Sequence, residues 1–100
     1  MHDRRFEPRF MVHEPVEVSW RDGTGAEQTC TGFIKDYSRS GARIEIAQPL
    51  RVQTRLQVNV REQRLSASVK SCTRAPFGFT IGLEFAPDFE GILTVPRRTA

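Results

Sequence analysis

The sequence predicts an all-β fold, a small antiparallel barrel of six strands. Apolar and polar residues alternate with period two through most of the chain, which is typical of strands with one buried face. Short turn signals separate the alternating runs, and no helical pattern lies between them, so the strands are expected to pair mainly antiparallel. A short chain with this many half-buried strands usually closes into a small barrel, because closure removes exposed strand edges.

Five of the strands are predicted by clear alternation. Their apolar positions are Val16, Val18 and Trp20; Ala42, Ile44 and Ile46; Leu56, Val58 and Val60; Leu65, Ala67 and Val69; and Phe77, Phe79, Ile81, Leu83 and Phe85. The stretch 26–36 predicts the remaining strand less clearly, and it comes second in the chain. Tyr37 is expected to face the barrel interior, and the phenylalanines of the last run, Phe77, Phe79 and Phe85, are expected in the core.

Turn residues mark the connections. "RDGTG" at 21–25 is expected to join the first two strands, "SRSG" at 38–41 to precede the third, and "REQR" at 61–64 to form a hairpin between the fourth and fifth. The chain is therefore divided into an arginine-rich, flexible segment at 1–11, a barrel at 12–86 and a short tail at 87–100. The tail is expected to hold at most one short helical turn, because Gly91 and Pro96 oppose a longer helix.

Composition and charge indicate where the protein is located and what kind of partner it binds. One hundred residues make one small domain, no apolar run is long enough to span a membrane, and the basic N-terminus lacks the apolar stretch of a secretory signal. Cys30 and Cys72 lack metal-ligand spacing and are interpreted as free thiols in a reducing cytoplasm. The net charge of +3 favours an anionic partner, although a solvated basic face is the commoner explanation of such a charge.

The residues offer no sign of an enzyme. His2 and His13 lie near the N-terminus, and no motif places either of them beside a nucleophile. No metal-binding spacing, glycine-rich phosphate loop or nucleophile elbow is present in the sequence. We therefore expect no catalytic residue, no metal and no cofactor.

Two short stretches are more informative. "RRFEPRF" at 4–10 places Arg4, Arg5 and Arg9 close together with Glu7 as the one local carboxylate, and Pro8 opposes a helix interior. These arginines therefore suit an anion that comes from outside the segment. "DYSRSG" at 36–41 stands before the third strand and, taken alone, is typical of a turn.

Together, the two stretches resemble a known family. Arg5 and Arg9 form Arg-x-x-x-Arg before the first strand, and Asp36, Ser38 and Gly41 form Asp-x-Ser-x-x-Gly before the third. This order and spacing, with the glycine-containing last strand "IGLEF", resembles the PilZ domain, the bacterial cyclic di-GMP receptor module. The resemblance covers roughly residues 4–86. The short, broken tail departs from the longer C-terminal helix of many PilZ domains.

The resemblance implies a ligand and a role for each motif residue. Arg5 and Arg9 are expected to clamp phosphate and guanine of cyclic di-GMP, with Arg4 supporting a second stacked ligand molecule. Asp36 is expected to accept hydrogen bonds from N1–H and the exocyclic amine of guanine, with Ser38 at the same base and Gly41 allowing close backbone approach. Binding would order the N-terminal segment and signal to a protein partner that the sequence does not identify.

Other interpretations stay open at this point. An OB-like barrel that binds single-stranded nucleic acid would explain the charge and the β pattern, but it predicts exposed aromatic residues and gives Asp36 no role. No specific DNA or RNA is therefore expected. A third hypothesis is a degenerate PilZ module that contacts only proteins. The presence of every motif residue argues against it. Arg4 and Arg5 could also form a disordered basic tail, with Arg9 paired to Glu7 or Glu14.

Overall fold

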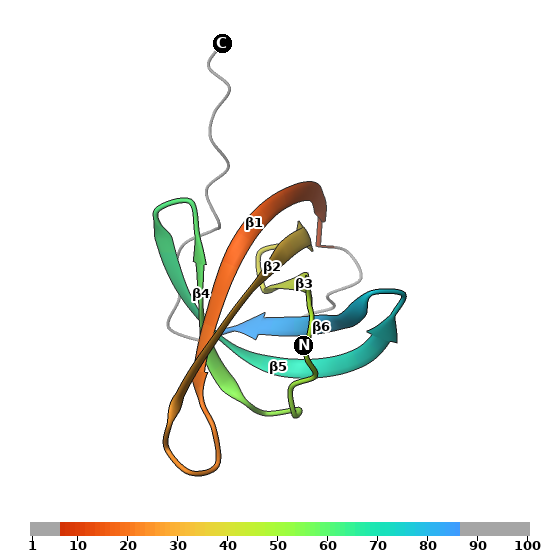
Figure 1. Cartoon of the computed structure of the whole chain (residues 1–100). Helices are drawn as coiled ribbons and strands as arrows, with labels where there is room; N and C mark the ends of the chain where they lie inside the picture. Colours follow the sequence, from red (N-terminus) through yellow and green to blue (C-terminus); the bar gives the residue numbers. More distant parts are fainter. Residues whose placement is uncertain (1–6, 87–100) are drawn as a thin grey trace.

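The computed structural model describes residues 7–86 and confirms six strands that close into a barrel (Figure 1). The strands are β1 (Phe10–Arg21), β2 (Glu27–Tyr37), β3 (Gly41–Ile46), β4 (Arg55–Val60), β5 (Gln63–Ala75) and β6 (Gly78–Phe85). β1 begins two residues before the boundary expected at residue 12. The helical turn expected in the tail lies outside the described residues, as do Arg4 and Arg5.

The barrel consists of two antiparallel meanders. Its strand order is β1-β2-β3-β6-β5-β4, so β1–β3 form a first meander and β4–β6 form a second. The segment 47–54 connects them along the chain. Two seams join them in space: β3 pairs with β6 over six residue pairs, and β1 pairs with β4 over four, residues 17–20 against 56–59. All neighbouring strands are antiparallel, as the sequence predicts.

The period-two apolar residues form the core. The inward positions of the first strand, the third, the fourth and the first half of the fifth are all buried, and Val18, Ile44, Val69 and Ile81 have no measurable exposure. Tyr37 is 3% exposed and faces the interior, which confirms its expected direction. Closing the sheet on itself lets small β-branched side chains from six strands fill one continuous interior.

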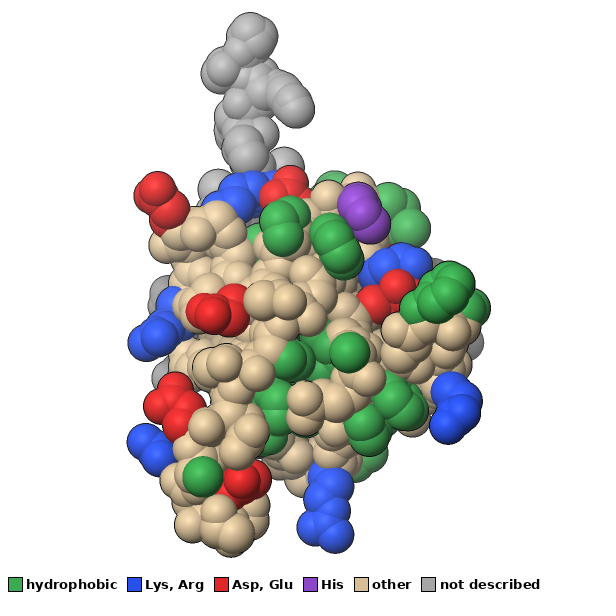
Figure 2. Space-filling model, in the orientation of Figure 1, with side chains coloured by type: hydrophobic (Ala, Val, Ile, Leu, Met, Phe, Trp, Pro, Cys, Tyr) green, Lys and Arg blue, Asp and Glu red, His purple; other side chains and the backbone are tan. Residues whose placement is uncertain are grey.

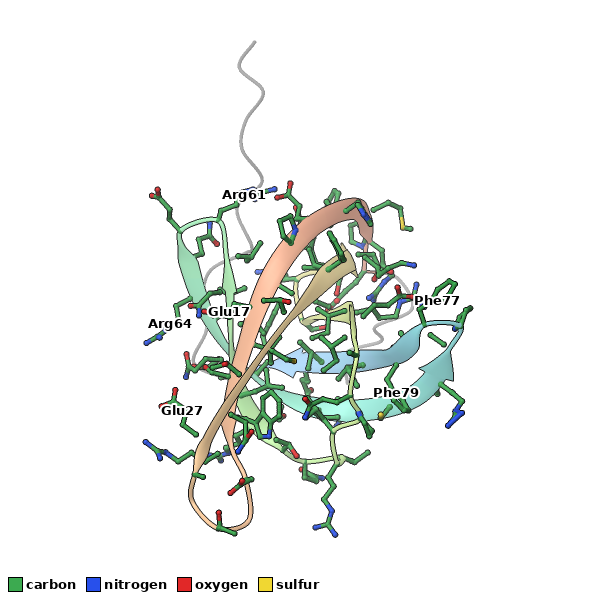
Figure 3. All side chains as sticks on the ribbon, in the orientation of Figure 1. Glu17, Glu27, Arg61, Arg64, Phe77 and Phe79 are labelled. Atoms are coloured by element: carbon green, nitrogen blue, oxygen red, sulfur yellow. The ribbon has the colours of Figure 1, made fainter. Side chains whose placement is uncertain are left out.

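One prediction about the core was wrong. Phe77 is 97% exposed and lies at the tip of the β5–β6 hairpin (Figure 3), Phe79 is half-buried, and of the three phenylalanines expected in the core Phe85 alone is buried. The alternating pattern runs on through Phe77, but the chain turns at residues 76–77, where Gly78 has φ of +149°. A turn residue has no inward face, so strand periodicity does not apply to Phe77.

The face that Figure 2 shows has no continuous basic track of the kind that a nucleic-acid backbone follows. Lys and Arg side chains on this face stand apart from one another, with acidic and apolar side chains between them. Phe10 and Phe33 are partly exposed, but each makes a local ring contact, Phe10 with Tyr37 at 5.3 Å and Phe33 with His13 at 4.6 Å between ring centroids. The described part of the chain contains no helix long and apolar enough to cross a membrane.

Candidate ligand-binding site

A bulge in β2 positions Asp36. Ile34 pairs with Ile44 and faces the core, so strict alternation would also turn Asp36 inward. The register shifts between Ile34 and Asp36, and Asp36 therefore pairs with Arg43 on the outer face of the barrel. A second bulge, between Val69 and Ser71 of β5, turns Ser71 to the outer face, where it pairs with Gly82.

Two arginines enclose the Asp36 carboxylate. Arg9 donates from Nε at 3.0 Å and from Nη2 at 2.6 Å to Oδ1. Arg43 donates from Nε at 2.9 Å to Oδ2 and places Nη2 2.7 Å from the same oxygen. The side chain of Asp36 is 1% exposed, whereas those of Arg9 and Arg43 are 45% and 54% exposed. A buried carboxylate thus fixes two guanidinium groups whose outer edges face solvent.

The electrostatics keep this carboxylate ionised. Burial acts to raise the pKa of Asp36, but hydrogen bonds and charge from Arg43 and Arg9 outweigh it, so the pKa lies below the ordinary value of 3.8. Hydrogen bonding to Asp36, together with its charge, raises the pKa of Arg43. One negative and two positive charges leave this cluster with a net charge of +1, which suits an anion.

The second motif folds as a tight turn beside the cluster. The Ser38 amide donates to the Gly41 carbonyl at 2.7 Å, and the Ser40 hydroxyl donates to Glu7 Oε1 at 2.8 Å. Ser38 Oγ is buried and has no hydrogen-bond partner among residues 7–86. A Cβ on Gly41 would overlap the carbonyl oxygen of Leu83, so the β3–β6 seam requires glycine there. An unpaired buried hydroxyl is costly and marks a position suited to a ligand atom.

The two arginines and the turn residues line one cleft of about 440 Å³, and the buried Asp36 adjoins it through its hydrogen bonds to those arginines. Its walls include Arg9, Ser38, Gly41, Arg43, Lys70 and Gly82, and it crosses the β3–β6 seam. A larger cleft of about 930 Å³ lies beside the β1–β4 seam, and no residue of either motif lines it. Among the described residues, no group of three or more His, Cys, Asp or Glu side chains is arranged to hold a metal ion.

The structure brings Arg9, Asp36, Ser38 and Gly41 together in this region. The alternative in which Arg9 pairs with Glu7 or Glu14 does not occur, because Arg9 binds Asp36 and Glu14 pairs with Arg61 at 2.6 Å. The sequence analysis missed Arg43. Arg43 lies at an outward position of the alternating strand "GARIEI", which predicts a solvated side chain. The bulge that places Asp36 opposite Arg43 has no clear signal in the sequence.

The chain matches the family model described as "PilZ domain" over residues 3–92. No curated protein gives a significant sequence match. Among solved structures, the PilZ domain with c-di-GMP of YcgR from Escherichia coli is similar, with 16% identity, coverage of 88% of this chain and 82% of that chain, and a TM-score of 0.63.

Two further structures have the same fold. The PilZ domain of CeSA from a cellulose-synthesizing bacterium has 23% identity and a TM-score of 0.56, and the match covers 82% of this chain and 83% of that one. The MrkH–c-di-GMP complex from K. pneumonia has 19% identity and a TM-score of 0.61, and the match covers 89% of this chain and 47% of that one.

Proposed function

This chain belongs to the PilZ domain family, and on that premise we propose that it is a receptor that binds cyclic di-GMP without chemical turnover. One observation supports this most: the described parts of the two motifs, Arg9 from the first and Asp36, Ser38 and Gly41 from the second, meet at one cationic cleft. The similar YcgR and MrkH structures contain c-di-GMP.

The ligand's chemistry fits the free groups of the cleft. Each arginine uses Nε and Nη2 on Asp36, which leaves the outer Nη1–Nη2 edge for a phosphate or a guanine. Arg4 and Arg5 of the first motif would add charge for the remaining phosphates. Ser38 Oγ would gain the hydrogen bond that it lacks among the described residues.

A change of partner at Asp36 would provide the switch. With both carboxylate oxygens occupied by arginines, Asp36 reaches a guanine only if one arginine leaves. Arg9 precedes β1, whereas Arg43 is fixed within β3, so Arg9 is the one that can move without breaking strand pairing. We infer that Arg9 transfers to the ligand, that Oδ1 then accepts from guanine N1–H and the exocyclic amine, and that the N-terminal segment follows.

The rearranged segment would be the signal to a protein partner. A cytoplasmic location suits a receptor of a bacterial second messenger and the free thiols Cys30 and Cys72. No catalytic step is needed, because the output is a change in the surface that the partner meets.

Calorimetric titration with cyclic di-GMP tests the proposal. Arg5→Ala, Arg9→Ala and Asp36→Ala should each weaken binding at least about tenfold, because each removes hydrogen bonds to a charged group. Arg51→Ala is the matched control: it removes an exposed arginine of the 47–54 segment that does not line the cleft, and its Kd should stay at the wild-type value. Wild-type affinity in the three motif variants, with the fold intact, would contradict the site.

A further inference from the structure

Arg43 is held from two directions. Its backbone lies in β3, paired with Asp36 of β2 on one side and Gly82 of β6 on the other. Its guanidinium is fixed by Asp36 through Nε and Nη2. Arg43 is therefore positioned by the barrel wall itself, unlike Arg9, and it needs no ordering step before a ligand arrives.

The outer edge of this guanidinium is available. Nη1 and the second N–H of Nη2 form a planar fork, and no described residue accepts a hydrogen bond from it. Half of the side chain is exposed, and it lines the cleft. Such a fork matches two neighbouring acceptors, as on a phosphate or at O6 and N7 of guanine.

The cleft surface beside Arg43 is free of large side chains at two positions. Its partner Gly82 has no side chain, and neither does Gly41, which lies two residues before Arg43 on the same strand face. A Cβ on Gly82 would overlap Ser71 Oγ, so the hydroxyl of this neighbouring β5 residue occupies the space over Gly82. The cleft next to the guanidinium is therefore lined by a serine hydroxyl and backbone atoms, with no bulky side chain from position 41 or 82 to block a ligand.

We propose that Arg43 is a further ligand-binding residue, which donates to O6 and N7 of the guanine that faces Asp36. This inference rests on the proposed function. On guanine, O6 adjoins N1–H, so a ring whose N1–H points at Oδ1 of Asp36 brings O6 toward the guanidinium held on Oδ2. Adenine has an amino group in place of O6, so two hydrogen-bond donors, this amino group and the Arg43 guanidinium, would face each other. Arg43 thus selects guanine over adenine.

The test compares three cyclic dinucleotides on the wild type, Arg43→Gln and Arg43→Lys. Cyclic di-IMP keeps O6 and N7 and lacks the 2-amino group, whereas cyclic di-AMP lacks O6. Arg43→Gln should weaken binding of cyclic di-GMP and cyclic di-IMP by at least about fivefold and change cyclic di-AMP little, because one bidentate base contact is lost. Arg43→Lys keeps the charge beside Asp36 but not the planar fork, so it should lose the same selectivity.

Arg39→Gln is the matched control. Arg39 is exposed in the neighbouring turn and does not line the cleft, so removing its charge should leave the selectivity unchanged. Thermal melting of each ligand-free variant checks the fold, and Arg43→Lys serves as the test if Arg43→Gln fails to fold.

The outcomes separate this inference from the proposed function. Equal weakening of all three dinucleotides, or no weakening in a folded variant, overturns the role of Arg43 while cyclic di-GMP binding by the wild type stands. A wild type that binds none of the three overturns the proposed function, and the inference falls with it.

Discussion

At the scale of single residues, Asp36 organises the candidate site. It is a buried carboxylate whose two oxygens each face a different arginine, one before β1 and one within β3. Removing a buried charge from between two cations leaves those cations facing each other, which is more costly than losing an exposed ion pair. Asp36 therefore links the stability of the domain to the geometry of its cleft.

Asp36 should make the stability of the domain depend on acid. Its folded-state pKa is lower than its ordinary value of 3.8, so its stabilising contribution is fully present above that value and is lost as pH falls through the folded pKa. We expect Asp36→Asn to lower the free energy of unfolding by about 1–3 kcal/mol at pH 7. The gap to wild type should shrink below about pH 4, because Asp36 of the unfolded chain then takes up a proton while folded Asp36 is still ionised.

Urea denaturation of both proteins at pH 7, 4 and 3 measures this effect. A gap that stays the same at all three pH values would show that the ionised carboxylate of Asp36 contributes nothing specific to stability.

The motif residues show what can be predicted at this scale. Arg9, Asp36, Ser38 and Gly41 were identified because the order and spacing of two short motifs resemble the PilZ domain, and the structure brings the four residues together. Arg43 was missed because its partner is set by the pairing of β2 with β3, and a one-residue bulge decides that pairing. Spacing along the chain contains no information about such a cross-strand contact.

At the scale of strands, the β3–β6 pairing shapes the cleft. Gly41 and Gly82 occupy positions on this seam where a side chain would meet another strand. The absence of a side chain at Gly41 lets β3 approach β6, and the absence of one at Gly82 leaves room for Ser71 Oγ of β5. The same two glycines thus allow close strand packing and set the shape of the cleft wall.

Gly41→Ala should therefore damage both properties. The added Cβ would overlap the Leu83 carbonyl, forcing β3 away from β6, so we expect a loss of about 1–3 kcal/mol in unfolding free energy and weaker binding of cyclic di-GMP. Gly23→Ala is the control, because a Cβ there would meet no atom within 4 Å, and its φ is not positive. Melting curves and titrations of both variants measure the difference, and equal behaviour of the two would contradict the requirement for glycine at position 41.

Strand periodicity predicted these elements well, and it failed where the chain turns. The inward residues of β1, β3 and β4 were all recognised because one buried face gives a regular pattern. Phe77 continues the same pattern into the tip of a hairpin, and nothing in its residue type distinguishes a strand position from a turn position. The sequence-based reading of Phe77 as core was therefore wrong for a physical reason: burial depends on where the strand ends.

At the scale of the whole molecule, the proposed ligand would bridge the two meanders. Arg9, Asp36 and Arg43 belong to the first meander or the segment before it, and Lys70 and Gly82 belong to the second. Barrel closure was predictable from the number of half-buried strands, whereas the order of the strands around the barrel required the structure.

The number of ligands bound is a property of the whole domain. Two stacked cyclic di-GMP molecules bring four phosphates into a small volume, and Arg4 is the additional arginine that would offset their repulsion. We expect wild type to bind two molecules per chain and Arg4→Leu to bind one. Titration at protein concentrations well above Kd measures the number of ligand molecules bound per chain at the end point. An end point of one for wild type, or an unchanged two for Arg4→Leu, would remove Arg4 from this role.

The division into two meanders also bears on where the chain can be cut. A nick at the exposed Gln48 leaves every strand whole and each meander contiguous, but it separates Asp36 and Arg43 from Lys70 and Gly82. Neither fragment has enough strands to close a barrel alone. The two fragments can therefore reassociate only by pairing β3 with β6 and β1 with β4. A dinucleotide held across the β3–β6 seam would favour the reunited form by mass action. If the chain is divided at this point, association of the two fragments would indicate that the cyclic dinucleotide is present.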